Sequence, residues 1–447
     1  MKTAPHMKIV HLLGWYFPDS VGGTEVYVEG LCRRLQDAGH EVLIAAPDPQ
    51  RTAPEQYEYH GVPVFRYPIT DHPTRDEAYH RVAMPGAAHL FRWLADQRPD
   101  ILHVHSIKTG VGLPEFREAH RMGIRIIATC HLPSLGYLCR TGELMQGGKH
   151  PCDGIVWPGK CAACSLTHVG LPSLPSRLAG AIPPSIGAVL RVLPGKAGTV
   201  LGMSALVVEY QKMQRELFEI VERFVVLNET AYRMLVADGS PAEKLAVNRL
   251  GLSQSGVRRK PGPDERPTIQ PVHFGFAGRL HTAKGVVQIA RAVLAIPRDV
   301  AFRVDIRAPV LDAGARAIEV ELRRIAADDP RVHFEPAVTS SEIPAALAEL
   351  DVLLSPSLWF ENGPTIALEA MAVGTPIIAT RVGNLAELIE DGVNGRLVEA
   401  GSVAELSAAI LEAATSPETT IDVWRRALRP VRTMDDIARD YMTMYAA

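Results

Sequence analysis

Two carboxylates, Glu361 and Glu369, stand on either side of the pair Gly363-Pro364. The glycine predicts a turn, and the proline suits the first position of a helix that would carry Glu369 about two turns in. An exposed helix N-terminus offers unpaired backbone N–H groups and partial positive charge, which together can bind phosphate. Carboxylates on both sides of such a site would accept hydrogen bonds from hydroxyl groups. The alternative is a surface helix that carries two solvated glutamates.

Two cations precede this helix in the same half of the chain. Arg279 and Lys284 lie in the loop Gly278–Gly285, directly after the apolar run Val272–Ala277, which predicts a strand. Ligands of open parallel sheets bind beyond the carboxyl ends of the strands. The two side chains could therefore neutralise a diphosphate leaving group. Taken alone, a surface arginine and lysine would mean little.

The N-terminal half opens with a similar order of elements. The run Lys8–Leu13 predicts a buried strand, and Gly22 and Gly23 lie in the loop before a helix that ends near Ala38. Strand, glycine-rich loop and helix are typical of a nucleotide-binding unit, in which glycines let the backbone approach a ligand closely. The alternative is an ordinary turn before a helix.

Two further predicted strands of this half, Asp100–His105 and Arg125–His131, each end in a histidine. The carboxyl ends of parallel strands meet at one edge of a sheet, so we expect His105 and His131 at the rim of the ligand cleft. The alternative is that each is a structural or merely exposed histidine.

Four cysteines lie close together in the sequence, with 12, 8 and 2 residues between them: Cys139, Cys152, Cys161 and Cys164. Four thiols, two of them as C-x2-C, predict a four-coordinate metal site for zinc or an iron–sulfur cluster, in which His150 or His168 could replace one cysteine. The alternative is incidental free thiols, since a disulfide is not expected in the cytoplasm. A bound metal would explain how a loop with so few apolar residues can fold.

The stretch that follows, residues 154–208, contains no Asp or Glu, yet it carries Lys160, Arg177, Arg191 and Lys196 among many Leu, Ile, Val and Pro residues. An apolar and basic composition predicts contact with a membrane surface. The alternative is a helical subdomain packed on the main body. No apolar run reaches the ~20 residues that span a bilayer.

The composition of the chain predicts its number of domains, its partners and its location. A chain of 447 residues with 47% hydrophobic and 22% charged residues predicts two or three domains with ample core. The net charge of −3 gives no overall attraction to nucleic acid, so no nucleic-acid partner is expected. Met1–His6 lacks the apolar core of a signal peptide, so we expect a cytoplasmic location, at the inner face of the membrane if the apolar-basic stretch binds lipid.

Taken together, the motifs resemble the retaining glycosyltransferases of family four, of the GT-B type. The resemblance lies in Val21-Gly22-Gly23-Thr24-Glu25, His105, Thr129-Cys130-His131, Gly278-Arg279-Leu280, Lys284-Gly285, and the stretch Glu361–Glu369 with the Ala-Met-Ala-x-Gly-x-Pro run that follows it. It implies an α/β protein of two Rossmann-like doubly wound domains facing across a cleft. The expected domains are 1–262, with a cysteine-rich and apolar insertion at about 132–213, then 263–420, and C-terminal helices 421–447 that cross back to the N-terminal domain.

The resemblance also implies the reaction, transfer of a sugar from a UDP- or GDP-sugar to a glycan or lipid-linked acceptor in cell-surface polysaccharide or glycolipid synthesis. Arg279 and Lys284 would hold the diphosphate, and Glu369 would accept the ribose hydroxyls. Glu361 would contact the sugar. The remaining implied contacts are Gly363, Pro364 and Thr365 at the donor, Gly22 and Gly23 near its phosphates, His131 at a hydroxyl of the transferred sugar, and His105 on the acceptor side.

No Asp-x-Asp stands in a metal-donor position, so transfer is expected to need no cofactor, and a metal in the cysteine cluster would be structural. Gly251-Leu252-Ser253-Gln254 departs from the Gly-Val/Ile-Asp of many family members. Two other functions stay open. A nucleotide-sugar 2-epimerase shares the architecture and the donor, although the Glu361 and Glu369 pair argues against it. A non-catalytic sugar-nucleotide-binding scaffold would need one of the motifs broken.

Overall fold

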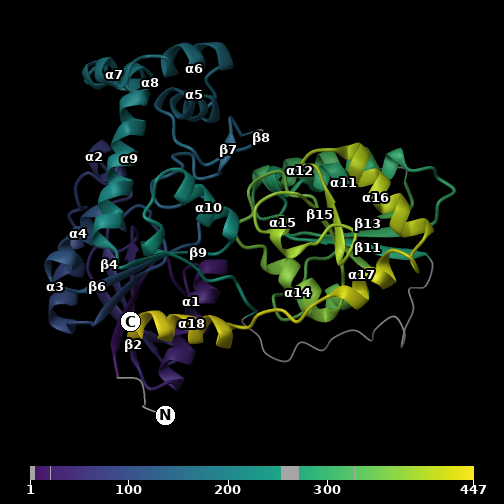
Figure 1. Cartoon of the computed structure of the whole chain (residues 1–447), viewed down its shortest axis with the longest axis horizontal. Coiled ribbons are helices and arrows are strands. Elements are labelled where there is room, and N and C mark those ends of the chain that lie inside the picture. The colour runs from purple at the N-terminus through teal and green to yellow at the C-terminus, as the bar shows by residue number, and fades with distance from the viewer. Residues whose placement is uncertain (1–5, 21, 149, 253–270, 327–328) are drawn as a thin grey trace. The chain divides into compact units, whose positions relative to one another are not determined.

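The computed structural model describes residues 6–20, 22–148, 150–252, 271–326 and 329–447 (Figure 1). The chain divides into two compact units, Met1–Ser253 with Thr433–Ala447, and Gln254–Arg432. The expected domain boundary between residues 262 and 263 lies outside the described residues. Residues 421–432, which we grouped with the C-terminal helices, fall in the second unit.

The first unit is built on an eight-stranded sheet. In spatial order the strands are β10 (Leu245–Val247), β9 (Arg223–Val226), β6 (Arg125–Cys130), β5 (Ile101–Val104), β1 (Lys8–Leu12), β2 (Glu41–Asp48), β4 (Val62–Pro68) and β3 (Glu55–Tyr59). Neighbouring strands are parallel except for β3, which pairs antiparallel with β4. Near-continuous apolar runs are expected in parallel strands, which are buried on both faces.

Six helices and one short 3-10 helix accompany this sheet: α1 (Gly23–Asp37), α2 (Arg75–Ala78), α3 (Ala87–Gln97), α4 (Leu113–Arg121), α10 (Glu229–Ala237), α18 (Met434–Ala446) and η1 (Ala242–Lys244). The last of the α-helices, α18, comes from the far end of the chain. Arg34 of α1 pairs with Asp435 at 2.5 Å, and Tyr441 and Tyr445 are fully buried. The C-terminal helix therefore completes the core of the N-terminal unit.

The connection between β6 and β9 holds the cysteine-rich and apolar stretches. Its elements are β7 (Met145–Gln146), β8 (His150–Pro151), α5 (Pro158–His168), α6 (Ser173–Gly180), α7 (Pro184–Leu190), α8 (Gly195–Leu201) and α9 (Met203–Ile220). Helices α5 to α8 gather at the end of α9 that lies away from the sheet (Figure 1). They share a small core with α9 that includes Ala162, Leu166 and Leu206. The stretch 154–208 is therefore helical, as the subdomain alternative expected.

The second unit has a six-stranded parallel sheet, in the order β13 (Val332–Glu335), β12 (Phe302–Arg307), β11 (Val272–Ala277), β14 (Val352–Ser355), β15 (Ile377–Thr380) and β16 (Gly395–Val398). Its helices are α11 (Val286–Ala295), α12 (Ala313–Ala326), α13 (Ile343–Glu349), α14 (Thr365–Val373), α15 (Leu385–Leu388), α16 (Val403–Thr415) and α17 (Ile421–Ala427), with the 3-10 helix η2 (Thr282–Lys284). Val352 and Leu354 belong to one apolar cluster and Leu353 to another, so each face of the sheet packs its own core.

The C-terminal helices expected from residue 421 are α17 and α18, which are separate because Pro430 follows α17 and Thr433 caps α18 through a reciprocal pair with Asp436. The helix predicted after Gly363 was wrong in detail. Helix α14 begins at Thr365 with Pro364 as its N-cap, one residue later than predicted. Glu369 therefore lies just over one turn into the helix and not two.

Candidate functional site

A buried ion pair joins two of the predicted site residues in the second unit. The Lys284 ammonium lies 2.6 Å from Glu361 Oε1, and Ser357 donates its hydroxyl to the same oxygen at 2.5 Å. Glu361 is buried, whereas the Lys284 side chain keeps 26% of its exposure. The carboxylate is thus fixed by two partners, and the lysine retains donors that face outward.

Two glycines set the backbone around this pair. Gly285 has a φ of +66°, and a Cβ there would lie 1.9 Å from the Pro356 carbonyl oxygen. Gly383 has a φ of +50°, and its Cβ would lie 2.3 Å from the Glu361 carbonyl oxygen. The Leu358 amide donates to the Ala283 carbonyl at 2.7 Å, which ties the lysine-bearing loop to the glutamate-bearing loop. Only glycine fits both approaches without strain.

Helix α14 presents its N-terminus and Glu369 from the same segment. Pro364 is the N-cap, and no side chain caps the helix. Its first turn therefore offers backbone N–H groups and the positive end of the helix dipole. Burial raises the pKa of the Glu369 carboxyl to about 7. Thr365 is exposed and Gly363 half-buried, so the approach to the helix end is open on that side.

The other predicted cation, Arg279, is not part of this ion pair. It is exposed, and its guanidinium makes no ion pair with any residue that the structure describes. Lys284 and Glu361 are brought together by the fold, whereas Arg279, on the loop after β11, forms no ion pair with the described part of the chain.

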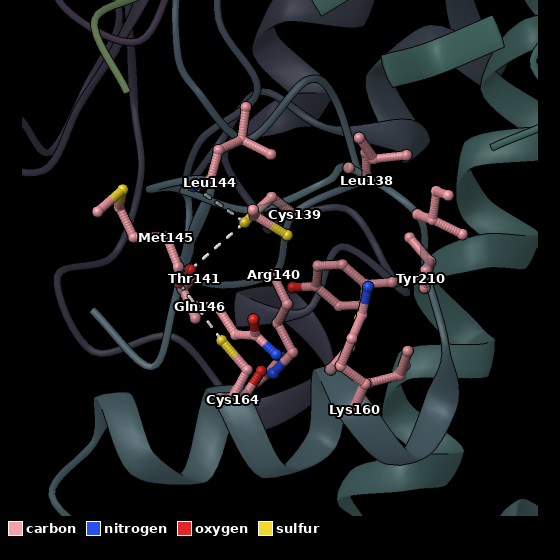
Figure 2. A pocket seen from close by; sticks show the side chains of 17 residues that line it. Leu138, Cys139, Arg140, Thr141, Leu144, Met145, Gln146, Lys160, Cys164 and Tyr210 are labelled. Carbon is pink, nitrogen blue, oxygen red and sulfur yellow. Dashed lines mark hydrogen bonds between the residues drawn. The ribbon is translucent and has the colours of Figure 1, made fainter. Parts of the chain in front are cut away.

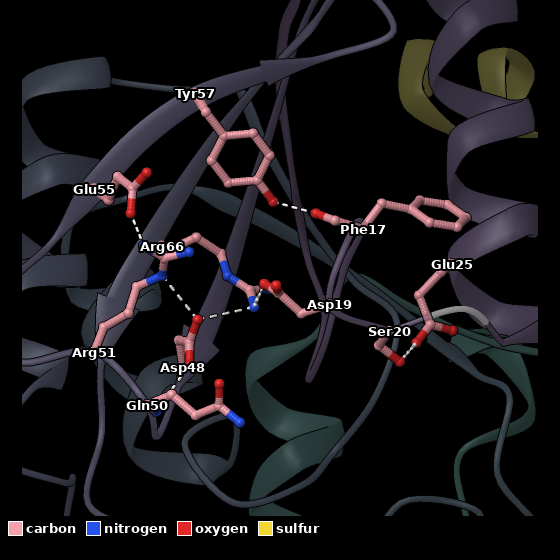
Figure 3. Close-up of polar contacts among 10 residues, drawn as sticks. All are labelled: Phe17, Asp19, Ser20, Glu25, Asp48, Gln50, Arg51, Glu55, Tyr57 and Arg66. Carbon is pink, nitrogen blue, oxygen red and sulfur yellow. Dashed lines mark hydrogen bonds and ion pairs between the residues drawn. The ribbon is translucent and has the colours of Figure 1, made fainter.

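In the first unit, a polar network holds the loop that leads to Gly22 and Gly23 (Figure 3). Arg66 is fully enclosed and bonds Asp19 at 2.9 Å and Asp48 at 3.1 Å. Tyr57 donates its hydroxyl to the Phe17 carbonyl, and Ser20 donates to Glu25 at 2.6 Å. The loop is thus anchored on β2, β3 and β4, ahead of the N-terminus of α1. Val21 lies outside the described residues.

The two glycines differ in what surrounds them. Gly22 is the N-cap of α1, with no side-chain cap on the helix, and a Cβ there would lie 2.8 Å from the Glu25 carboxylate. A Cβ on Gly23 would meet no atom within 4 Å among the described residues. No described atom of the protein would therefore clash with a larger side chain at position 23. Glycine at this position leaves room for a ligand to approach the backbone closely.

Three histidines form a hydrogen-bonded row at the carboxyl ends of β1, β5 and β6. His11 Nδ1 lies 2.8 Å from His105 Nε2, and His105 Nδ1 lies 3.2 Å from His131 Nε2. Burial lowers the pKa of His11 and of His131 to about 3, and burial together with the neighbouring imidazoles lowers the pKa of His105 well below its ordinary value. All three imidazoles are therefore neutral at pH 7.

The unpaired nitrogen at the inner end of the row indicates which way the protons point. His11 Nε2 is buried and has no hydrogen-bond partner among the described residues. A bare lone pair is easier to leave unpaired in the interior than an N–H group. We therefore infer that His11 donates to His105 and that His105 donates to His131. The proton of His131 is then on Nδ1, at the outer end of the row.

A fourth histidine, His103, lies beside the row. Its ring nitrogens bond the Tyr445 hydroxyl at 2.6 Å and the Thr129 hydroxyl at 2.7 Å. The sequence prediction named neither His11 nor His103, because both fall inside apolar strand runs. The available signal was the pair His103 and His105, since alternate residues of a strand share one face. Within the described chain, His11, His103 and His105 are the one set of ligand-type side chains with ligand atoms within 4.8 Å of each other. Apart from His11 Nε2, their ring nitrogens already serve as partners in the hydrogen bonds above.

The four cluster cysteines all line one small cavity of about 40 Å³ in the first unit (Figure 2). His150 and His168, the alternative ligands, are not among the residues that line it. His168 instead lies 3.3 Å from Glu143. The structure holds all six cysteines as free thiols.

Both halves of the chain match known protein families. Residues 271–416 match the family described as glycosyl transferases group 1, and residues 21–172 match glycosyltransferase family 4. The chain belongs to the family 4 glycosyltransferases. As the resemblance implied, the two units have the GT-B type of fold, two Rossmann-like α/β domains with mostly parallel sheets.

Individual relatives of this family 4 member agree with that assignment. A D-inositol 3-phosphate glycosyltransferase of Pseudarthrobacter chlorophenolicus is 35% identical over 35% of this chain and 37% of its own length. The amylovoran biosynthesis glycosyltransferase AmsK of Erwinia amylovora is 29% identical over 55% of this chain and 61% of its own. The matches thus span less than two thirds of either relative.

Solved structures share the fold of this family 4 member over nearly its whole length. Sucrose-phosphate synthase from Thermosynechococcus elongatus gives a TM-score of 0.63 at 16% identity, covering 98% of both chains. HepE of Anabaena, solved in complex with UDP, gives 0.63 at 15% identity, covering 99% of this chain and 100% of its own.

The close approach at Gly285 yields a test of the site's architecture. Gly285→Ala should destabilise the protein by more than the ~1–2 kcal/mol of a left-handed non-glycine residue, because the new Cβ also meets the Pro356 carbonyl. Gly392→Ala is the matched control, since Gly392 has a φ of +77° and only the Arg396 guanidinium, 3.9 Å away, near its Cβ. Urea unfolding measures both, and equal losses for the two variants would contradict the role of the clash.

Proposed function

We propose that the chain is a retaining glycosyltransferase that moves a sugar from a nucleotide-diphosphate sugar to a glycan or lipid-linked acceptor. The observation that carries the proposal is the buried Lys284 and Glu361 pair, which lies just before the uncapped N-terminus of α14. Family membership adds the reaction class, and the known structures supply a precedent, since HepE was solved with UDP.

The positive groups of the second unit would act on the leaving group. As the glycosidic bond breaks, negative charge develops on the diphosphate oxygen, and preorganised cations and N–H groups stabilise that charge. Arg279 is exposed and free to reach a ligand, and Lys284 is already positioned by Glu361. The N–H groups at the start of α14, after Gly363, Pro364 and Thr365 make the turn, complete the phosphate site.

The two carboxylates would bind hydroxyl groups. Glu361 keeps one oxygen on Lys284 and Ser357, so its other oxygen is the one to accept a sugar hydroxyl. Glu369 has no ion pair with the described residues, and it would accept the ribose hydroxyls. A metal is not required in this scheme, because protein cations neutralise the diphosphate.

The N-terminal unit would contribute neutral hydrogen-bond donors and a backbone that the ligand can approach closely. His131, with its proton on Nδ1, would donate to a hydroxyl of the transferred sugar. His105 would orient the His131 imidazole through their hydrogen bond, and would itself lie on the acceptor side. Gly22 and Gly23 would lie by the donor phosphates at the start of α1. In a retaining transfer without a carboxylate nucleophile, the departing phosphate helps to deprotonate the acceptor on the same face.

A lipid-linked acceptor would bring the protein to a membrane, and helices α6 to α8 offer a surface for it. Six large apolar side chains here are each at least 40% exposed: Leu174, Leu178, Ile186, Val189, Val192 and Leu193. Arg177 and Lys196 are exposed beside them without ion pairs to described residues, and residues 154–208 hold no acidic residue. This surface complements anionic lipid headgroups. No described helix is both long and apolar enough to span a bilayer.

Replacing the catalytic carboxylate tests the reaction. Glu361→Gln should lower turnover of the donor by about 10²–10³-fold, because the amide no longer fixes Lys284 or accepts strongly from the sugar. Nucleotide binding, read as a thermal shift with UDP and GDP, should change only a few-fold. The control is Glu418→Gln at an exposed site. Loss of nucleotide binding with Glu361→Gln would show that its role is assigned wrongly.

The raised pKa of Glu369 predicts a pH dependence of binding. At pH 6 this carboxyl is mostly protonated, and at pH 8 it is ionised and ready to accept ribose hydroxyls. The affinity for UDP should therefore rise by about tenfold from pH 6 to pH 8 beyond the change that UDP's own phosphate causes. Calorimetry on Glu369→Gln supplies that background. Equal pH dependence in the wild type and the variant would refute the assignment.

Cosedimentation tests the membrane surface. Wild-type protein should pellet with vesicles of phosphatidylcholine and phosphatidylglycerol, and Val189→Ser with Val192→Ser should reduce the bound fraction several-fold. Val320→Ser, at an equally exposed valine of α12, is the matched control. Undiminished binding of the double variant would leave these helices as ordinary packing.

A further inference from the structure

The four cluster cysteines come from three separate segments and meet at one cavity. Cys139 follows β6, Cys152 follows the β7–β8 hairpin, and Cys161 and Cys164 are one turn apart in α5. The cavity measures about 40 Å³. Figure 2 shows Cys139 and Cys164 on facing walls, one on the loop and the other on the helix. Convergence in space is a stronger signal than the sequence spacing, which matches no standard finger.

The loop that carries Cys139 has an unusual backbone for a segment with so little regular structure. Between residues 135 and 154 the left-handed positions include Leu135, Leu144, Gly136, Gly142, Gly147 and Gly154, and two of these are leucines with φ of +47° and +52°. Non-glycine residues in this region persist only where surrounding structure holds them. The two-residue strands β7 and β8 supply little of that support.

Backbone N–H groups point at two of the sulfurs. The Gly147 amide donates to Cys164 Sγ at 3.1 Å, and the Leu144 amide donates to Cys139 Sγ at 3.4 Å. Hydrogen bonds of this kind stabilise sulfur that carries negative charge, and they recur around thiolate metal centres. A neutral thiol is only a weak acceptor, so an N–H donor is better matched by a thiolate. As a neutral thiol, Cys164 also donates to the Met145 carbonyl at 3.5 Å.

The four cysteine sulfurs lie around the cavity and do not converge on a single point. No three of the four sulfurs lie within 4.8 Å of one another. Among the described side chains, the set that meets this condition is His11, His103 and His105. A single zinc ion with bonds of about 2.3 Å needs sulfurs about 4 Å apart, so a change of χ1 rotamer at one or two cysteines would be required. A larger iron–sulfur cluster accepts a wider ring of thiolates.

We propose that Cys139, Cys152, Cys161 and Cys164 bind a metal as four thiolates, either one zinc ion or an iron–sulfur cluster, and that this centre fixes the loop of residues 132–157 to α5. The role is structural, because the residues that line the cavity include neither the histidines of the row nor Lys284 and Glu361.

Metal analysis of the full-length protein, purified without oxygen or chelator, tests the proposal directly. We expect about one zinc per chain, or iron with an equal amount of labile sulfide and a visible absorption band. Cys161→Ser with Cys164→Ser should lower the metal content at least tenfold. Cys32→Ala, which removes a buried thiol of α1 outside the cluster, is the matched control and should keep the wild-type content.

A second measurement covers the case in which the double variant does not fold. Thiol titration of native wild-type protein should find the four cluster cysteines protected, and a strong chelator should expose them and lower the melting temperature. Three results would overturn the proposal. One is folded wild-type protein that holds no metal and takes up no added zinc. The others are a double variant with wild-type metal content and a disulfide between Cys161 and Cys164 in anaerobic protein.

Discussion

The site in the second unit depends on two places where backbone passes directly against backbone. Gly285 lies against the Pro356 carbonyl, and Gly383 lies against the Glu361 carbonyl. The first approach fixes the distance between the loop after β11 and the loop after β14, and the second holds the loop after β14 against the segment after β15. Because that distance is set by main-chain contact, Lys284 and Glu361 can form a short ion pair in a partly buried setting without reorganisation. Preorganisation of this kind is what an electrostatic site needs, since movement during the reaction would cost part of the stabilisation.

The two units hold charge in different ways. In the second unit, the candidate site contains charged side chains that are either ion-paired, as Lys284 is, or exposed, as Arg279 is. In the first unit, burial keeps His11, His105 and His131 neutral, and the row positions a proton without creating a cation. Hydroxyl recognition needs oriented donors and acceptors, whereas a diphosphate needs positive charge. The neutral histidine row therefore suits a hydroxyl group, and the cations of the second unit suit an anion.

Much of the sheet could be predicted from the sequence, and the reasons for the misses are physical. Strand β11 was predicted to the residue, because Val272–Ala277 is a largely apolar run. Strand β3, Glu-Gln-Tyr-Glu-Tyr, was missed because it is an edge strand with half-exposed polar residues and no apolar pattern. The individual site residues were named from their types and positions and from the motif resemblance, but their contacts join distant segments. Lys284 and Glu361 are 77 residues apart in the sequence, and His105 and His11 are 94 residues apart. Spacing along one chain carries no information about such contacts.

The last helix of the chain has a consequence for biosynthesis. Helix α18 places Tyr441 and Tyr445 among His103, Thr129 and the other buried residues of the first unit. During translation, the first 250 or so residues leave the ribosome without this part of their core. The second unit, which is continuous in the sequence, can fold as it emerges, while the first must wait for the final residues. The order of synthesis is thus the reverse of the order in which the two units can be completed.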